Sequence, residues 1–172
     1  MAILETAKMP KSKGGFTLIE LLIVIGIISV LAAIIFVAVD PARRFSEARN
    51  AQRWSEANAV LNAILKCTVD NNGTLPSAVG SAAAGTTYMI GTGSDFAGCT
   101  PATTAVMNLG ASTCESGTTL APDYIASVPI DPIGGSTWTA AKTGYYIVKT
   151  SSGRITVGSC AGERSETISV TR

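Results

Sequence analysis

The chain has 172 residues, enough for one modest domain with an appended segment. Its formal net charge is +1, so no global charge attracts it to nucleic acid. It contains no histidine, which excludes Ser-His-Asp and Cys-His catalytic arrangements and most catalytic zinc sites. We therefore do not expect an enzyme, and we predict no cofactor, no metal site and no specific nucleic-acid partner.

Residues 16–39 form an apolar segment in which Glu20 is the only charged residue. As a helix, this segment would be about 36 Å long, which exceeds the roughly 30 Å of bilayer hydrocarbon. The alternative is a buried core helix, but the chain has no second segment of this kind to surround it. We therefore predict a membrane-spanning helix over 16–39.

A basic stretch precedes the span and ends in Gly14-Gly15, so residues 1–15 are typical of a targeting leader. An ordinary secretory signal has the same order and could be cut near Val30-Leu31-Ala32, but such a signal gains nothing from Glu20. Charge counting does not orient the span. Basic residues lie on both sides of it: Lys8, Lys11 and Lys13 before, and Arg43, Arg44, Arg49 and Arg53 after.

Glu20 needs an explanation because a carboxylate at a bilayer centre costs on the order of 2.5–3.5 kcal/mol. Glu20 lies four residues after Phe16, where the cost is smaller, and the span offers no Lys or Arg as a partner. Cleavage between Gly15 and Phe16 would create an α-amine at Phe16, in the same chain or in a neighbouring copy. Pairing with a neighbour's amine would make departure from the membrane conditional on assembly.

The run Gly15-Phe16-Thr17-Leu18-Ile19-Glu20 and the apolar segment after it resemble the class III signal of type IV pilins and type II secretion pseudopilins. The resemblance is strong over residues 8–40 and looser to residue 76. It implies that a prepilin peptidase cuts after Gly15 and that Phe16 is N-methylated. It also implies that Glu20 sets the register between subunits by pairing with the N-terminus of the adjacent subunit.

The same resemblance implies a location and a set of partners. The unassembled protein would be a single-pass inner-membrane protein with its head outside the cytoplasm, in contact with membrane lipid. The assembled form would be an extracellular or periplasmic filament. The partners would be copies of the chain, other pilins, the prepilin peptidase, and the pilus or secretion assembly machinery.

One departure from the family pattern concerns proline. Many members carry a proline in the last third of the span, whereas residues 32–39 contain none and the next proline is Pro41. Because glycine costs up to about 1 kcal/mol in a helix interior, we expect the weak points of this helix at Gly26 and Ser29.

Residues 40–72 predict an amphipathic continuation of the helix. Asp40-Pro41 either begins a new helix or bends the long one, and Asn71-Asn72-Gly73 ends it. The arginines after the span alternate with acids, so we expect Glu–Arg pairs on a solvated face rather than a nucleic-acid or lipid-headgroup patch. For Trp54 we expect a place at a subunit contact or at the membrane boundary, and the sequence does not choose between them. The core-facing stripe is Ala57, Val60, Leu61, Ile64, Leu65 and Thr68.

Residues 73–172 predict a globular head with its strands late in the chain. Residues 144–150 and 154–157 form a hairpin around Ser151-Ser152-Gly153, and residues 167–170 supply a third strand. Residues 80–88 are a loop, and disorder is an alternative for parts of 78–120. The predicted fold is α+β and pilin-like, with a long helix, membrane-spanning in its first half, packed on a small antiparallel β-sheet head.

Four cysteines follow the span, and neither a C-x-x-C motif nor a histidine accompanies them. They predict two disulfides in an oxidising compartment. Of the three possible pairings we favour Cys99–Cys114, as a local staple, with Cys67–Cys160.

Two short motifs have a simpler explanation than a ligand. Residues 129–135 resemble a region that binds calcium in some pseudopilins, but a turn at Asp131-Pro132 explains Asp131 better, and Asp123 is the only other nearby carboxylate. Asn72-Gly73-Thr74 fits the N-glycosylation pattern, yet it ends a helix naturally.

We therefore predict four parts: a leader at 1–15, a span at 16–39, a helix continuation at 40–72 and a head at 73–172. The predicted function is that of a structural subunit in a type IV pilus-like filament for adhesion, motility or DNA uptake. A type II secretion pseudopilin is the alternative, disfavoured because the head lacks an acidic calcium loop. A membrane-anchored surface-binding domain that does not polymerise is a further alternative, and an enzyme in the head is a distant fourth.

Overall fold

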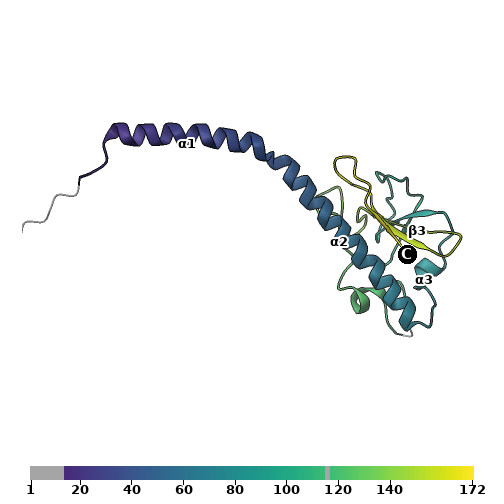
Figure 1. Cartoon of the computed structure of the whole chain (residues 1–172). Coiled ribbons are helices and arrows are strands. Elements are labelled where there is room, and N and C mark those ends of the chain that lie inside the picture. Colours follow the sequence, from purple (N-terminus) through teal and green to yellow (C-terminus); the bar gives the residue numbers. More distant parts are fainter. Residues whose placement is uncertain (1–13, 115–116) are drawn as a thin grey trace, which may run out of the picture. The chain divides into compact units, whose positions relative to one another are not determined.

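The computed structural model describes residues 14–114 and 117–172. The chain divides into two compact units, one up to Pro41 and one from Ala42 onward. The strand and helix labels below are those of Figure 1.

The described part of the first unit contains one helix, α1 (Leu18–Val39), and residues 14–17 before it are non-helical. The helix is continuous through Gly26 and Ser29, so neither of these predicted weak points breaks it here. The Ser29 hydroxyl donates a 2.7 Å hydrogen bond to the carbonyl of Ile25, and the helix continues although such a bond slightly destabilises it. The helix ends instead at Asp40, whose φ of 42° is left-handed.

A second helix, α2 (Pro41–Asp70), opens the second unit. It begins at a proline, which fits the first helical position because an N–H there has no intrahelical partner. It ends as predicted: Asn72 and Gly73 adopt φ values of 51° and 86°, and the Gly73 N–H reaches the Thr68 carbonyl. Two short helical turns follow, α3 (Ser77–Gly80) and η1 (Leu120–Tyr124).

A five-stranded sheet forms the head, in the order β2-β1-β3-β4-β5. The predicted hairpin is β3 (Tyr145–Lys149) with β4 (Ile155–Ser159), and the predicted third strand is β5 (Ser169–Thr171), which pairs antiparallel with β4. Sequence analysis missed the other two strands, β1 (Thr87–Ile90) and β2 (Ala105–Met107).

The expectation of a purely antiparallel sheet was wrong, because β1 and β2 run parallel. The chain between them, residues 91–104, is a crossover rather than a tight turn. A parallel pair requires such a connection, of about a dozen residues or more. The fold is therefore α+β with a mixed sheet.

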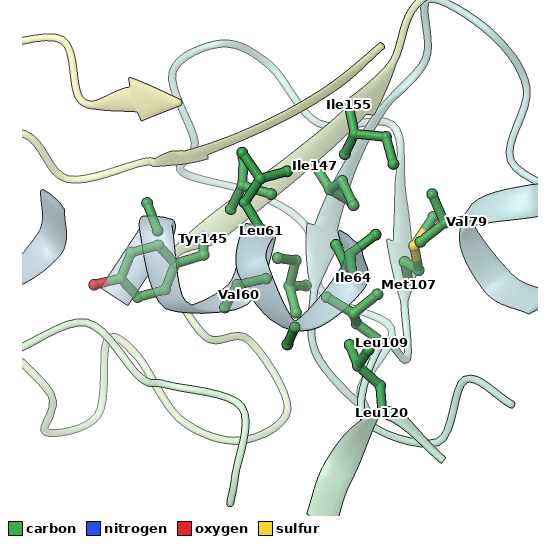
Figure 2. Packing of buried hydrophobic residues seen from close by; sticks show 14 of the residues in the cluster. Val60, Leu61, Ile64, Val79, Met107, Leu109, Leu120, Tyr145, Ile147 and Ile155 are labelled. Atoms are coloured by element: carbon green, nitrogen blue, oxygen red, sulfur yellow. The ribbon is translucent and has the colours of Figure 1, made fainter. Parts of the chain in front are cut away.

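α2 packs against the sheet through the predicted apolar stripe (Figure 1). Figure 2 shows Val60, Leu61 and Ile64 of the helix meeting Tyr145, Ile147 and Ile155 of the sheet. The segment after β2 closes the core with Leu109 and Leu120, which are 1% and 0% exposed. This continuous apolar contact fixes α2 to the head.

All four cysteines form disulfides, but the favoured pairing was wrong. The bonds are Cys67–Cys114 and Cys99–Cys160, with Cα–Cα distances of 5.6 and 4.4 Å. Cys67 is buried on the core face of α2, where Leu109, Cys114 and Leu120 also pack. Strand β2 lies between Cys99 and Cys114 along the chain, so the two are not a local staple, and each bond ties the 91–119 region to a distant element.

Candidate functional site

The first turn of α1 is closed by a capping box. Thr17 is extended, with φ −77° and ψ 154°, and its hydroxyl accepts a 3.2 Å hydrogen bond from the Glu20 N–H. In return, the Thr17 N–H and hydroxyl donate to Glu20 Oε2 at 2.8 and 2.9 Å. The two side chains thus satisfy backbone N–H groups that a helix start leaves without partners.

The capping box also sets where the helix begins. Gly15 and Phe16 lie before the cap in non-helical, exposed chain, and Phe16 is 90% exposed. The Gly15–Phe16 bond is therefore outside the helix and accessible. The structure places Gly15, Phe16 and Glu20 within this short stretch and gives Glu20 the neighbour Thr17, which sequence analysis did not assign to it.

The whole of α1 has an uncovered apolar surface. None of its residues is buried, and the large side chains from Leu18 to Val39 are between 47% and 82% exposed. Within the described residues, the one helical stretch long and apolar enough to cross a membrane is Leu18–Asp70, which includes α1. An apolar surface of this extent requires lipid or other apolar helices around it.

A second polar site lies on α2 and overturns the expectation of a fully solvated arginine face. The Arg53 and Asp131 side chains are both 0% exposed. Arg53 binds the two carboxylate oxygens of Asp131 at 2.7 and 2.9 Å, and its remaining nitrogen donates to Glu163 and to Asn50 Oδ1. This planar, two-bond geometry is the arrangement in which an arginine–carboxylate pair is strongest.

Glu163 joins this cluster from the segment after β4. It binds Arg49 through two 2.5 Å hydrogen bonds and Arg53 through one of 2.9 Å. The bonds from Arg49, together with those from Arg53, lower the pKa of the Glu163 carboxyl to about 2, against partial burial. Burial opposes the charge on Arg53, yet its hydrogen bonds to Asp131 and Glu163 raise the pKa of its guanidinium.

The exposed charges near the start of the helix pair as predicted. Glu47 pairs with Arg43 at 2.7 Å and with Arg44 at 3.2 Å on an exposed face. Trp54 packs within its own chain, since its indole N–H donates to Glu166 at 2.8 Å. Glu56 accepts a hydrogen bond from the Tyr145 hydroxyl, and burial, followed by this bond, raises the pKa of Tyr145.

The turn predicted at Asp131 is present. The Ile133 N–H donates to Asp131 Oδ1 at 3.0 Å, and the Gly134 N–H donates to the Asp131 carbonyl at 2.8 Å. The salt bridge to Arg53 was missed. The sequence carries a signal for the burial of Arg53, but not for its partner. Asn50 and Arg53 continue the helical spacing of the buried stripe toward the start of α2.

A comparison with known families identifies the first unit. Residues 10–36 match the family model described as the prokaryotic N-terminal methylation motif. This is the prepilin-type signal of type IV pilins and pseudopilins. The match covers the end of the leader and most of α1 and does not reach the head. No curated protein and no solved structure matches the chain.

Proposed function

We propose that the protein is a structural subunit of a type IV pilus-like filament. It is inserted in the inner membrane with its head outside the cytoplasm, cut by a prepilin peptidase after Gly15 and methylated at Phe16. It is then polymerised through α1 by an assembly machine. The observation that carries this proposal is the juxtaposition of the methylation motif with a helix that has no buried residue.

Glu20 supplies the chemistry of assembly in this proposal. Cleavage leaves a charged α-amine at Phe16, and the Glu20 carboxylate of an adjacent subunit is an oppositely charged partner for it. Among the described residues of its own chain, Glu20 is held by neutral groups of Thr17. The bonds from Thr17 to the Glu20 carboxylate are already charge-assisted. A cationic amine in their place adds the attraction between two opposite charges.

The pilin role is proposed ahead of a type II secretion pseudopilin. Asp131, the main carboxylate of the region compared with a calcium site, is bound through both oxygens to Arg53. Asp123 accepts a hydrogen bond from the Thr119 N–H at 2.7 Å. Both carboxylates thus bind groups of the head itself. This favours a pilin over a pseudopilin with a calcium loop.

The intact mass of the protein from membranes of a host that expresses a prepilin peptidase tests this function. We expect a chain that begins at Phe16 and bears one methyl group, and the full-length chain when the peptidase is absent. A chain that still begins at Met1, while a known prepilin in the same cells is cut, would overturn the proposal. A chain that begins near Ala33 would show a secretory signal instead. Filament imaging then separates a long pilus from a short pseudopilus.

A further inference from the structure

The face of α2 that meets the head changes its chemistry along the helix. The first buried positions carry the polar side chains of Ser46, Asn50 and Arg53. From Ala57 onward the buried positions are apolar, apart from the disulfide-bonded Cys67. Within 42–50, which we call the polar segment, no apolar side chain is buried. Separating this segment from the head therefore exposes no hydrophobic core.

The turn Glu163–Glu166 covers the polar segment. Besides the bonds from Glu163 to Arg49, Asn50 Nδ2 donates to the Glu163 carbonyl at 2.9 Å and to Glu166 Oε2 at 2.7 Å. Asn50 Oδ1 accepts from the Glu163 N–H at 3.1 Å. Every one of these contacts is polar, so water can replace each of them when the segment separates.

This turn is strained. It is closed by a 3.2 Å hydrogen bond from the Glu166 N–H to the Glu163 carbonyl, and its central residues, Arg164 and Ser165, have φ values of 58° and 61°. Positive φ at both central positions is the pattern of a type I′ turn, which favours Asn, Asp and Gly. Arg164 and Ser165 are exposed, so no burial of their own side chains offsets the strain.

We propose that the turn Glu163–Glu166 is a strained latch, which holds the polar segment of α2 on the head and can open while the core stays folded. The Arg53–Asp131 pair is the pivot. Both of its side chains are fully buried, and it follows the polar segment directly. Opening frees residues 42–50 to lose their helical hydrogen bonds, whereas the apolar stripe from Ala57 onward remains packed.

The strain of the closed turn favours opening of the latch. Strain that is present only in the closed turn lowers the cost of opening. Glycine adopts positive φ without this penalty, so Ser165→Gly should hold the latch closed more firmly. Glu163→Gln should do the opposite, because it removes the charge that Arg49 and Arg53 bind. The two variants act on the same turn in opposite directions.

Hydrogen–deuterium exchange of the full chain in detergent micelles tests the latch. Loss of a charged hydrogen-bond partner should speed exchange at residues 45–50 of Glu163→Gln by about tenfold or more. In the parent chain, the opening free energy that exchange reports should be smaller at residues 45–50 than at residues 57–67 and 145–159, which open only when the head unfolds. Ser165→Gly should slow exchange at 45–50. The matched control is Glu47→Gln, which breaks an exposed pair on the same segment and should leave exchange unchanged.

Three results would overturn the latch. Equal opening free energies at 45–50 and 57–67 in the parent chain would mean that the segment opens only with the core. Unchanged exchange at 45–50 would mean that the turn does not hold the segment. Faster exchange at 45–50 in Ser165→Gly would mean that the turn is not strained, and this result can be read even if Glu163→Gln fails to fold. The test does not depend on whether the chain forms filaments.

Discussion

At the scale of single residues, Arg53 joins α2 to the head through a buried ion pair. Its guanidinium is fully buried and joins three acceptors that come from different parts of the chain: Asp131, Glu163 and Asn50. Burying two charges is costly, and their mutual attraction offsets the cost only while both partners are present. Removal of one partner therefore leaves the other charge buried and uncompensated.

Arg53→Met should lower the free energy of unfolding by about 3–5 kcal/mol, since Asp131 would remain buried without its cation. Chemical denaturation of the full chain in detergent, followed by a spectroscopic signal of the head, measures this loss. Arg44→Met is the matched control, because Arg44 belongs to an exposed pair, and it should leave the midpoint nearly unchanged. Replacing Asp131 by Leu as well should restore part of the loss. A double variant as unstable as Arg53→Met would contradict the argument.

Glu163 makes the stability of the head sensitive to acid. Its pKa is lowered to about 2 from an ordinary 4.5. A lowered carboxyl pKa contributes stability that is fully present above about 4.5 and is lost as the pH falls toward 2. Unfolding midpoints between pH 6 and pH 2 should therefore fall less steeply in Glu163→Gln than in the parent chain. Glu47 and Asp95 also have lowered pKa values, so the difference between the variants is the informative quantity. Parallel curves would contradict the assignment.

These residues also show where sequence analysis reaches its limit. The burial of Arg53 can be inferred, because it lies in register with Ala57 and Val60 on one helical face. Its partners cannot be inferred in this way. Asp131 is 78 residues away and Glu163 is 110 residues away along the chain, and no local pattern links such distant charges. The interpretation of the arginines as a solvated face used only neighbouring acids, and for that reason it was right for Arg43 and wrong for Arg53.

At the scale of elements, the parts that carry a local signal were predicted. The cap residues and the apolar stripe gave α2, and the aromatic and β-branched run around a Ser-Ser-Gly turn gave β3 and β4. Strands β1 and β2 have four and three residues, too few for a periodic pattern to stand out. Their parallel pairing depends on a crossover and on the rest of the sheet, neither of which local spacing specifies.

The disulfide pairing also depends on contacts between distant parts of the chain, and it can be tested directly. Cys67→Ser should leave a free thiol on Cys114, and Cys99→Ser should leave one on Cys160. Peptide mapping under non-reducing conditions identifies which cysteine becomes free. Each variant should also lose roughly 2–4 kcal/mol of stability, because a long loop of the unfolded chain is no longer closed. A free thiol on Cys160 in Cys67→Ser would instead support the pairing first expected from sequence.

At the scale of the whole molecule, the two units have opposite requirements. Among the described residues, the buried side-chain nitrogen and oxygen atoms of the head all have hydrogen-bond partners within the chain. The helix α1, by contrast, buries nothing. The head is thus complete as a folded object, whereas α1 requires lipid or other apolar helices around it. A helix that passes from a membrane into the core of a filament has apolar surroundings in both places. Glu20 is the one charged residue of α1, and its surroundings differ between lipid and a filament core.

Glu20→Leu should therefore separate insertion from assembly. The leucine removes the cost of a carboxylate near the membrane, so the amount of protein in the membrane fraction should stay the same or rise. Filaments sheared from the cells should decrease by at least about tenfold, as expected when a charge-assisted bond worth about 1.5–3 kcal/mol is lost at every subunit contact. Glu20→Gln keeps the size and much of the polarity of the side chain, and it should also assemble poorly because it lacks the charge. Normal filaments from Glu20→Leu would show that α1 is a plain anchor, whereas normal filaments from Glu20→Gln alone would show that hydrogen bonding, and not charge, aligns the subunits.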